Sequence, residues 1–502
     1  MGRRRTGEDF SLLGSALAVA AREAQTLESL AAELDATPEE LSVCWIAVNS
    51  LRRHQGCTLP VPFEALRSEG AQDAGSASCN WYAPTWRLGK LLEEFQINEG
   101  LAAHYEHILT DPEGGHFELN LAASEVVRAT RLEGVEVDEA RLRRLCVQAC
   151  EPANGVELLV SNAGKILITI EEHRAEPLTA SFVEGLYAKL VKGITIKEDR
   201  DSRRRARALE AFCSFACASG DAHAGLDRGG CGSHTLVVAL VALYYFKTFR
   251  LFPAGNAVLA YLLYFLILHR AGYHFSAHVS VLKILYPSGE AEPSRGLGRA
   301  PEELAVACDG HYDWTRFFEG AASLIICEQR WTMAKLDGMA RRRERFRVII
   351  DADESLNFRQ KEVLLEAVLH SNAEFTYGIH EQRYDVSYPC ARSDFARLLD
   401  QGFLRQHDDG IRHFFVASDT FEEAFLEYLK VHCDEAFHRY YRDDGTLRDE
   451  HKGSGDIVVE YNKDVGFYEK SLLDKTYIEH YDFRRTPIAD HDGPRRRRSD
   501  NG

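Results

Sequence analysis

Residues 244–273, YYFKTFRLFPAGNAVLAYLLYFLILHRAGY, decide the fold of this chain. Two apolar segments, Thr235–Phe249 and Ala257–Leu268, flank a short break at Phe252–Asn256. A helix that is apolar on every side is buried in a protein core or a membrane. The second segment has only 12 residues before the next polar side chain, whereas a membrane span needs about 20. The stretch therefore predicts a buried helix–loop–helix at the centre of a mainly α domain.

The break between the two segments has the residues that end one helix and start another. Pro253 and Gly255 interrupt the first helix, and the side chain of Asn256 is of the type that caps a helix start. The first N–H groups of a helix have no partner within that helix and carry a partial positive charge. We therefore expect an anion site at the start of the second helix.

The same break resembles a known signature. The nine residues 250–258, RLFPAGNAV, are similar to the motif His-Pro-Phe-x-(Asp/Glu)-Gly-Asn-Gly-Arg of Fic-domain proteins, which transfer AMP from ATP to a protein hydroxyl. Phe252, Gly255 and Asn256 match, and the second helix closes on Ala-Gly-Tyr as in that family. The resemblance implies a Fic-type helical core with ATP as the ligand, and it assigns Phe252, Gly255 and Asn256 to nucleotide or anion binding. Arg250 joins them as a candidate, because a guanidinium near a helix start suits phosphate.

Three positions of this window depart from the signature. The motif histidine, a general base, is replaced by Arg250, which stays protonated and cannot accept a proton. The acidic metal ligand is replaced by Ala254, and the phosphate-binding arginine by Val258. We therefore expect no AMP transfer by the family mechanism, no catalytic residue in this window and no magnesium site, and favour a nucleotide- or partner-binding regulatory module.

An active nucleotidyltransferase with altered chemistry, modifying a protein hydroxyl, is the first alternative. It requires a base from elsewhere, and the histidines near the stretch are His234, His269, His274 and His278. His269 lies about three helical turns beyond the break, roughly 18 Å along a helix that rises about 1.5 Å per residue.

Glu99 is the candidate for an inhibitory residue. Glu99-Gly100 resembles the end of the inhibitory helix of many Fic proteins, whose glutamate pairs with the motif arginine. Because that arginine is Val258 here, Arg250 is the predicted partner of Glu99 if Glu99 reaches the loop, and the alternative is that Glu99 is an ordinary exposed acid of its helix.

Residues 355–417 read as three helices followed by a hairpin. The pattern resembles the C-terminal winged helix of many Fic proteins, and a DNA-binding winged helix would use Tyr388, Arg392, Arg397 and Arg405. Several aspartates, Asp394 among them, interleave with these residues and oppose phosphate binding. We therefore favour a docking role for this segment and keep a DNA-binding regulator as the second alternative.

The matches divide the chain into predicted regions. They are an N-terminal helical region (1–66), a linker (67–80), a Fic-like helical domain (81–345), a winged-helix domain (355–417) and an unassigned, charged C-terminal region with a basic tail (418–502). Residues 81–110 are predicted to be helical throughout.

Composition limits the partners and the compartment. The chain has 502 residues and a formal net charge of -17, which disfavours non-specific binding to nucleic acid. Its 12 cysteines form no CxxC pair, which is typical of reduced thiols in a cytosolic protein. We expect a cytoplasmic location, no membrane partner and an unidentified protein target or partner, with a homodimer left open.

Overall fold

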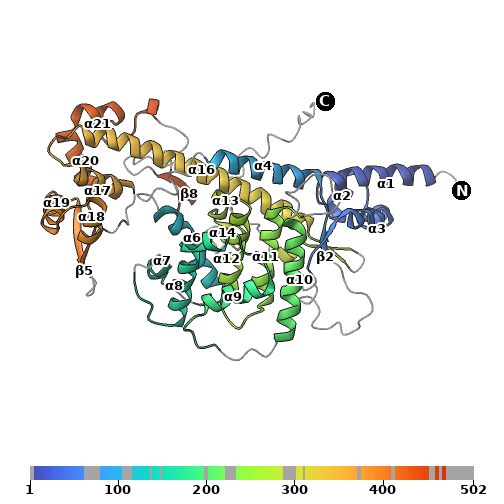
Figure 1. Cartoon of the computed structure of the whole chain (residues 1–502). Coiled ribbons are helices and arrows are strands. Elements are labelled where there is room, and N and C mark those ends of the chain that lie inside the picture. Colours follow the sequence, from blue (N-terminus) through green and yellow to red (C-terminus); the bar gives the residue numbers. More distant parts are fainter. Residues whose placement is uncertain are drawn as a thin grey trace, which may run out of the picture. The chain divides into compact units, whose positions relative to one another are not determined.

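The structure is a computed structural model that describes residues 5–60, 80–103, 116–135, 138–146, 150–196, 202–220, 233–286, 301–308, 311–369, 373, 375–408, 413–451, 458–462 and 466–470. The chain forms two compact units, Met1–Arg330 and Trp331–Gly502. Helices dominate both units (Figure 1), so the predicted mainly α class is confirmed. Among the described residues, no helix is both long enough and apolar enough to cross a membrane.

The first unit contains most of the helices. They are α1 (Arg5–Arg22), α2 (Leu27–Glu33), α3 (Pro38–Gln55), α4 (Trp86–Ala102), α6 (His116–Leu132), α7 (Glu139–Cys146), α8 (Gly155–Ile168), η3 (Ile170–His173), α9 (Ala180–Leu190), α10 (Ser202–Gly220), α11 (Thr235–Phe249), α12 (Asn256–Arg270), α13 (His274–Ala277), α14 (Val281–Leu285), α15 (Pro301–Leu304) and the start of α16 (Thr315–Asp351).

The core of this unit is the helix pair α11–α12. Each residue of α12 from Asn256 to His269 is buried, as expected for a segment without charge over most of its length. The two helices pack along each other, α6 and α8 contact α12, and α10 contacts α11 (Figure 1). The predicted buried helix–loop–helix is therefore present, and its surrounding helices position the loop between α11 and α12.

A small sheet also belongs to the first unit. Its strand order is β1 (Cys57–Thr58), β2 (Asn80–Tyr82), β4 (His311–Asp313) and β3 (Val306–Cys308), with β2 and β4 parallel and the other pairs antiparallel. The prediction of helix from residue 81 is wrong, because residues 80–82 form β2, in which Asn80 and Trp81 pair with β4, and α4 starts only after its cap Thr85. Cys57 is disulfide-bonded, so the expectation of reduced thiols fails for this residue.

A buried ion pair joins this sheet to α3. Arg52 Nη1 lies 2.7 Å from Asp313 Oδ2, and both side chains are almost fully buried. The guanidinium of Arg52 also lies 5.6 Å from the centre of the Trp81 ring. Asp313 in addition accepts a hydrogen bond from the N–H of Thr315, the first residue of α16, at 2.9 Å. One carboxylate therefore links α3, the sheet and the start of α16.

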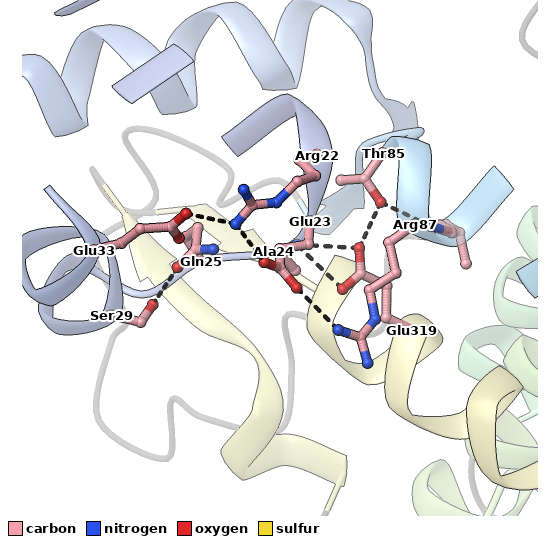
Figure 2. A network of polar contacts seen from close by, with 10 residues as sticks. Arg22, Glu23, Ala24, Gln25, Ser29, Glu33, Thr85, Arg87 and Glu319 are labelled. Atoms are coloured by element: carbon pink, nitrogen blue, oxygen red, sulfur yellow. Dashed lines mark hydrogen bonds and ion pairs between the residues drawn. The ribbon is translucent and has the colours of Figure 1, made fainter. Parts of the chain in front are cut away.

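The N-terminal helices are tied to α4 and α16 by a polar network (Figure 2). The carboxylate of Glu319 accepts hydrogen bonds from the backbone N–H of Ala24 at 3.0 and 3.1 Å and from the hydroxyl of Thr85. Next to it, Arg87 Nη1 lies 2.9 Å from Glu23 Oε2. These contacts fix the segment between α1 and α2 against the helices that follow the sheet.

The second unit begins within α16, at Trp331. It contains α17 (Phe358–Leu369), α18 (Tyr377–Tyr384), α19 (Tyr388–Asp400), β5 (Leu404–Asp408), β6 (His413–Ala417), α20 (Phe421–His432), α21 (Asp434–Tyr440), η5 (Asp449–His451), β7 (Val458–Asn462) and β8 (Gly466–Lys470). Strands β5 and β6 form an antiparallel pair, as do β7 and β8.

One hydrophobic core spans the second unit as far as Leu447. It combines Phe346 of α16, Phe395 of α19 and Phe415 of β6 with Phe425 of α20. Helices α20 and α21, which the sequence leaves unassigned, therefore pack into the same core as α17–β6.

Candidate functional site

The loop between α11 and α12 is closed by the side chain of Asn256. Its Nδ2 donates to the carbonyl of Phe252 at 2.7 Å, and its Oδ1 accepts from the N–H of Phe252 at 2.9 Å. The N-cap of α12 is Gly255, in the left-handed conformation with φ 71°, and not Asn256 as predicted. The physical reason is that both polar groups of the Asn256 amide already pair with the backbone of Phe252. Asn256 and Gly255 thus shape the loop.

Phe252 anchors the loop in the protein. It is buried, and its ring stacks on Tyr187 of α9 with 4.0 Å between ring centres. The guanidinium of Arg205 on α10 lies 5.4 Å from the centre of the Phe252 ring. Burial raises the pKa of Tyr187. Phe252 therefore packs the loop against α9, and its ring lies next to the guanidinium of Arg205 on α10.

Arg250 has the opposite environment. Its side chain is exposed, and its backbone adopts the left-handed conformation with φ 44° and ψ 56°. This conformation costs a non-glycine residue about 1–2 kcal/mol. Among the described residues, no hydrogen bond or ion pair involves Arg250. A strained backbone that presents an exposed guanidinium is the kind of feature found at ligand-binding sites.

The start of α12 already holds an anion. The N–H of Ala257 donates to Oε1 of Glu133 at 2.5 Å. Glu133 is half-buried and follows α6, 124 residues before Ala257 in the chain. An internal carboxylate therefore lies where the sequence predicts an anion site. The sequence does not indicate this role of Glu133, because Glu133 is far from Ala257 along the chain and only the fold brings the two residues together.

Ala254 and Val258, the other two positions that depart from the signature, differ in exposure. Ala254 is exposed, whereas Val258 is fully buried in α12. A side chain at position 258 thus faces the protein interior, and the valine fills core volume there.

Glu99 lies at the opposite end of α12 from the loop. Its carboxylate accepts hydrogen bonds from the N–H groups of Phe275 and Ser276, each at 2.9 Å, and from the hydroxyl of Ser276. Because α12 has 15 residues and rises about 1.5 Å per residue, the start of α13 is about 20 Å from Arg250. The predicted pairing of Glu99 with Arg250 is therefore wrong. Burial raises the pKa of Glu99, although the hydrogen bonds oppose this rise.

The four nearby histidines also lie away from the loop. His269 is in the last turn of α12, while His274 and His278 follow it. His234 caps the start of α11, and its ring centre lies 6.1 Å from that of Tyr273, beyond the end of α12. The structure thus places all four histidines at the end of the helix pair that is remote from the loop.

The second candidate surface is helix α19. Tyr388, Arg392 and Arg397 are exposed on it, as a groove-facing helix requires. Arg405 lies at the base of the β5–β6 pair, where its Nη1 is 2.9 Å from Oδ2 of Asp419. The tip of the hairpin lies outside the described residues.

Asp394 of α19 points away from that surface. It is buried and accepts hydrogen bonds from Asn357 Nδ2 at 2.6 Å and Arg359 Nε at 2.7 Å, with His380 Nε2 at 3.0 Å. These contacts, the hydrogen bond from Arg359 foremost among them, lower the pKa of Asp394 despite its burial. The expectation that Asp394 opposes phosphate binding is therefore wrong. Its carboxylate faces the interior of the unit, where it contacts Arg359 of α17 and His380 of α18 and so links these helices to α19.

The chain matches no protein-family model, and no curated protein matches it either. Among solved structures it is similar to a Fic family protein from Desulfovibrio desulfuricans G20, with 12% sequence identity and a TM-score of 0.34. That similarity covers 67% of this chain and 98% of the other. At this level it does not establish a shared site or activity.

Proposed function

We propose that this chain is a Fic-type protein that has lost AMP transfer and serves as a regulatory module, binding a phosphate-bearing ligand such as ATP at the α11–α12 loop. The observation that carries the proposal is the carboxylate of Glu133 bound to the N–H of Ala257, the second residue of α12. A helix start that attracts an internal anion suits an anionic ligand equally well.

Arg250 supplies the second part of the argument. It is exposed and strained next to this helix start. A guanidinium binds phosphate through two parallel hydrogen bonds and keeps its charge at all working pH values. The ligand would displace Glu133 from Ala257 and gain Arg250 as a partner.

The loss of transfer chemistry follows from the residues at the loop. Arg250 cannot act as a general base, and Ala254 offers no oxygen to a metal ion. Histidines that would repair the first loss lie at the far end of α12. These observations favour binding without catalysis.

Calorimetry of the full chain with ATP, with and without magnesium, tests this proposal. We expect magnesium-independent binding that weakens in Arg250→Ala, because the phosphate partner is lost. We expect it to tighten in Glu133→Gln, because the competing charge is removed while the amide oxygen remains. Arg397→Ala, an exposed arginine of the second unit, is the matched control. Absence of binding in wild type, or binding that requires magnesium, would contradict the proposal.

The inward orientation of Asp394 favours a second candidate function, recognition of DNA or of an acidic protein by α19. With Asp394 buried, the exposed part of the helix presents Arg392 and Arg397, with Asp400 at its last position. Duplex binding should weaken with salt and be lost in the double variant Arg392→Ala/Arg397→Ala, since each lost phosphate contact lowers the salt slope by about 1. Fluorescence anisotropy with labelled duplex DNA measures this. Wild type that binds no duplex at low salt would leave the acidic protein as the partner class.

A further inference from the structure

Three side chains with metal-binding chemistry meet beyond the end of α12. They are Glu171 of η3, His269 of α12 and His274 of α13. The ligand atoms of the three lie within 4.8 Å of one another. His274 Nδ1 is 3.1 Å from His269 Nε2, which in turn is 3.4 Å from Glu171 Oε1. The function proposed for the α11–α12 loop makes no use of this cluster.

Two of the three ligand separations are close to those around a tetrahedral ion, and the third, between Glu171 and His274, is within 4.8 Å. Zinc binds histidine nitrogen and carboxylate oxygen at about 2.0–2.2 Å, which places neighbouring ligand atoms of a tetrahedron about 3.3–3.5 Å apart. The two separations from His269 Nε2, 3.1 and 3.4 Å, are close to this value.

The elements that carry these ligands are each held in place. Arg270 donates two hydrogen bonds to the carbonyl of His173, at 2.9 and 3.2 Å, and so ties η3 to the end of α12. Glu99 binds the first N–H groups of α13, as described above, and so fixes the helix that begins with His274. His269 belongs to the buried core helix. A site whose supporting elements are fixed in this way is pre-organised.

The surrounding charge also suits a cation. His269 lies in the last turn of α12, and the end of a helix carries a partial negative charge. Arg174 is the opposing group, but its Nη1 lies 4.0 Å from Oε2 of Glu171 and leaves Oε1 facing His269. Glu171 is exposed, so an ion reaches the cluster from solvent.

We propose that Glu171, His269 and His274 form a Zn²⁺ site with one coordination position open to water. Two imidazoles and one carboxylate are a ligand set that zinc takes with a fourth position free. The ion would join η3, α12 and α13, three segments that otherwise meet through hydrogen bonds.

Zinc binding by the full chain tests this proposal. The measurement is a competition titration against a chromophoric chelator, with Glu171→Gln and His274→Ala compared with wild type. Glu171 is exposed, so its replacement does not disturb the core, and His54→Ala, an exposed histidine on α3, is the matched control. The expected result is one zinc per wild-type chain that is weakened by more than about 10-fold in both site variants, since even an outer partner of a metal ligand contributes about 10- to 100-fold.

Cobalt substitution separates this site from the cysteines of the chain. Co²⁺ bound by two imidazoles and a carboxylate should show the visible bands of tetrahedral cobalt without a thiolate charge-transfer band in the near ultraviolet. Both site variants should lose these bands while retaining the far-ultraviolet circular dichroism of wild type. Zinc affinity and cobalt bands that are unchanged in Glu171→Gln and His274→Ala would overturn the proposal and leave the cluster as a hydrogen-bonded histidine pair. The outcome is independent of ATP binding at the loop.

Discussion

The buried carboxyl of Glu125 should make the stability of the first unit fall as pH rises. Glu125 on α6 is only 2% exposed, and its Oε2 accepts the N–H of Leu282, at the start of α14, at 2.6 Å. Burial, the largest effect, raises its pKa from 4.5 to about 7. The ionisable groups that act on it or that it acts on are Arg128, Lys283, Glu328, Tyr261 and Tyr264.

The sign of the effect follows from proton binding. Between pH 4.5 and about 7 the folded protein keeps the proton on Glu125 while the unfolded chain loses it. The free energy of unfolding therefore decreases as pH rises through this interval. A pKa increase from 4.5 to about 7 corresponds to about 3 kcal/mol, at about 1.4 kcal/mol per pH unit.

Glu125→Gln removes the charge and keeps an oxygen for the N–H of Leu282. At pH 5, half a pH unit above the ordinary pKa of 4.5, the variant should be more stable than wild type by less than about 1 kcal/mol, because only a small part of the difference in proton binding between the folded and unfolded states has developed. At pH 8 it should be more stable than wild type by about 3 kcal/mol, since wild type then bears an unfavourable buried charge.

Denaturant unfolding of the full chain at a series of pH values measures this difference, and Glu28→Gln on the exposed surface of α2 is the control. A Glu125→Gln variant whose stability relative to wild type is the same at pH 5 and pH 8 would refute the reasoning.

Three further changes follow from the described contacts and are measured by the same unfolding assay. Arg52→Met should destabilise by about 3–5 kcal/mol, because it leaves Asp313 charged and buried, and adding Asp313→Asn should recover part of this loss. Asn256→Ala should cost at least about 2 kcal/mol, since it unpairs two buried backbone groups of Phe252 at about 1–3 kcal/mol each; an unchanged midpoint would contradict the proposed loop closure. Gly255→Ala should cost about 1–2 kcal/mol through its positive φ, and a neutral result would mean that the loop relaxes.

The sequence alone determined the elements that depend on neighbouring residues. The apolar run, the Pro-Gly break and the absence of charge place α11 and α12 within two residues of their observed ends. At the start of α3 the same kind of local signal is present, since the side chain of Thr37 caps the helix and Pro38 is its first residue. Local rules suffice here because the hydrogen bonds of a helix and its caps join residues at most four apart.

Long-range partners were decided only by the tertiary structure. Residues 80–82 form a strand because β4, more than 200 residues later in the chain, pairs with Asn80 and Trp81. Glu133 reaches the start of α12, and Asp394 turns inward to meet Arg359 and His380, so two acidic residues take roles that their sequence neighbours do not indicate.

The same holds for the two candidate binding sites. The sequence identified the α11–α12 loop and the three positions at which it departs from the signature that it resembles, since both depend only on which residues are present. The carboxylate that occupies the loop, and the meeting of Glu171 with His269 and His274, depend on how separate helices pack. Packing is set by the shape of the whole core, and a local pattern of residues does not contain that information.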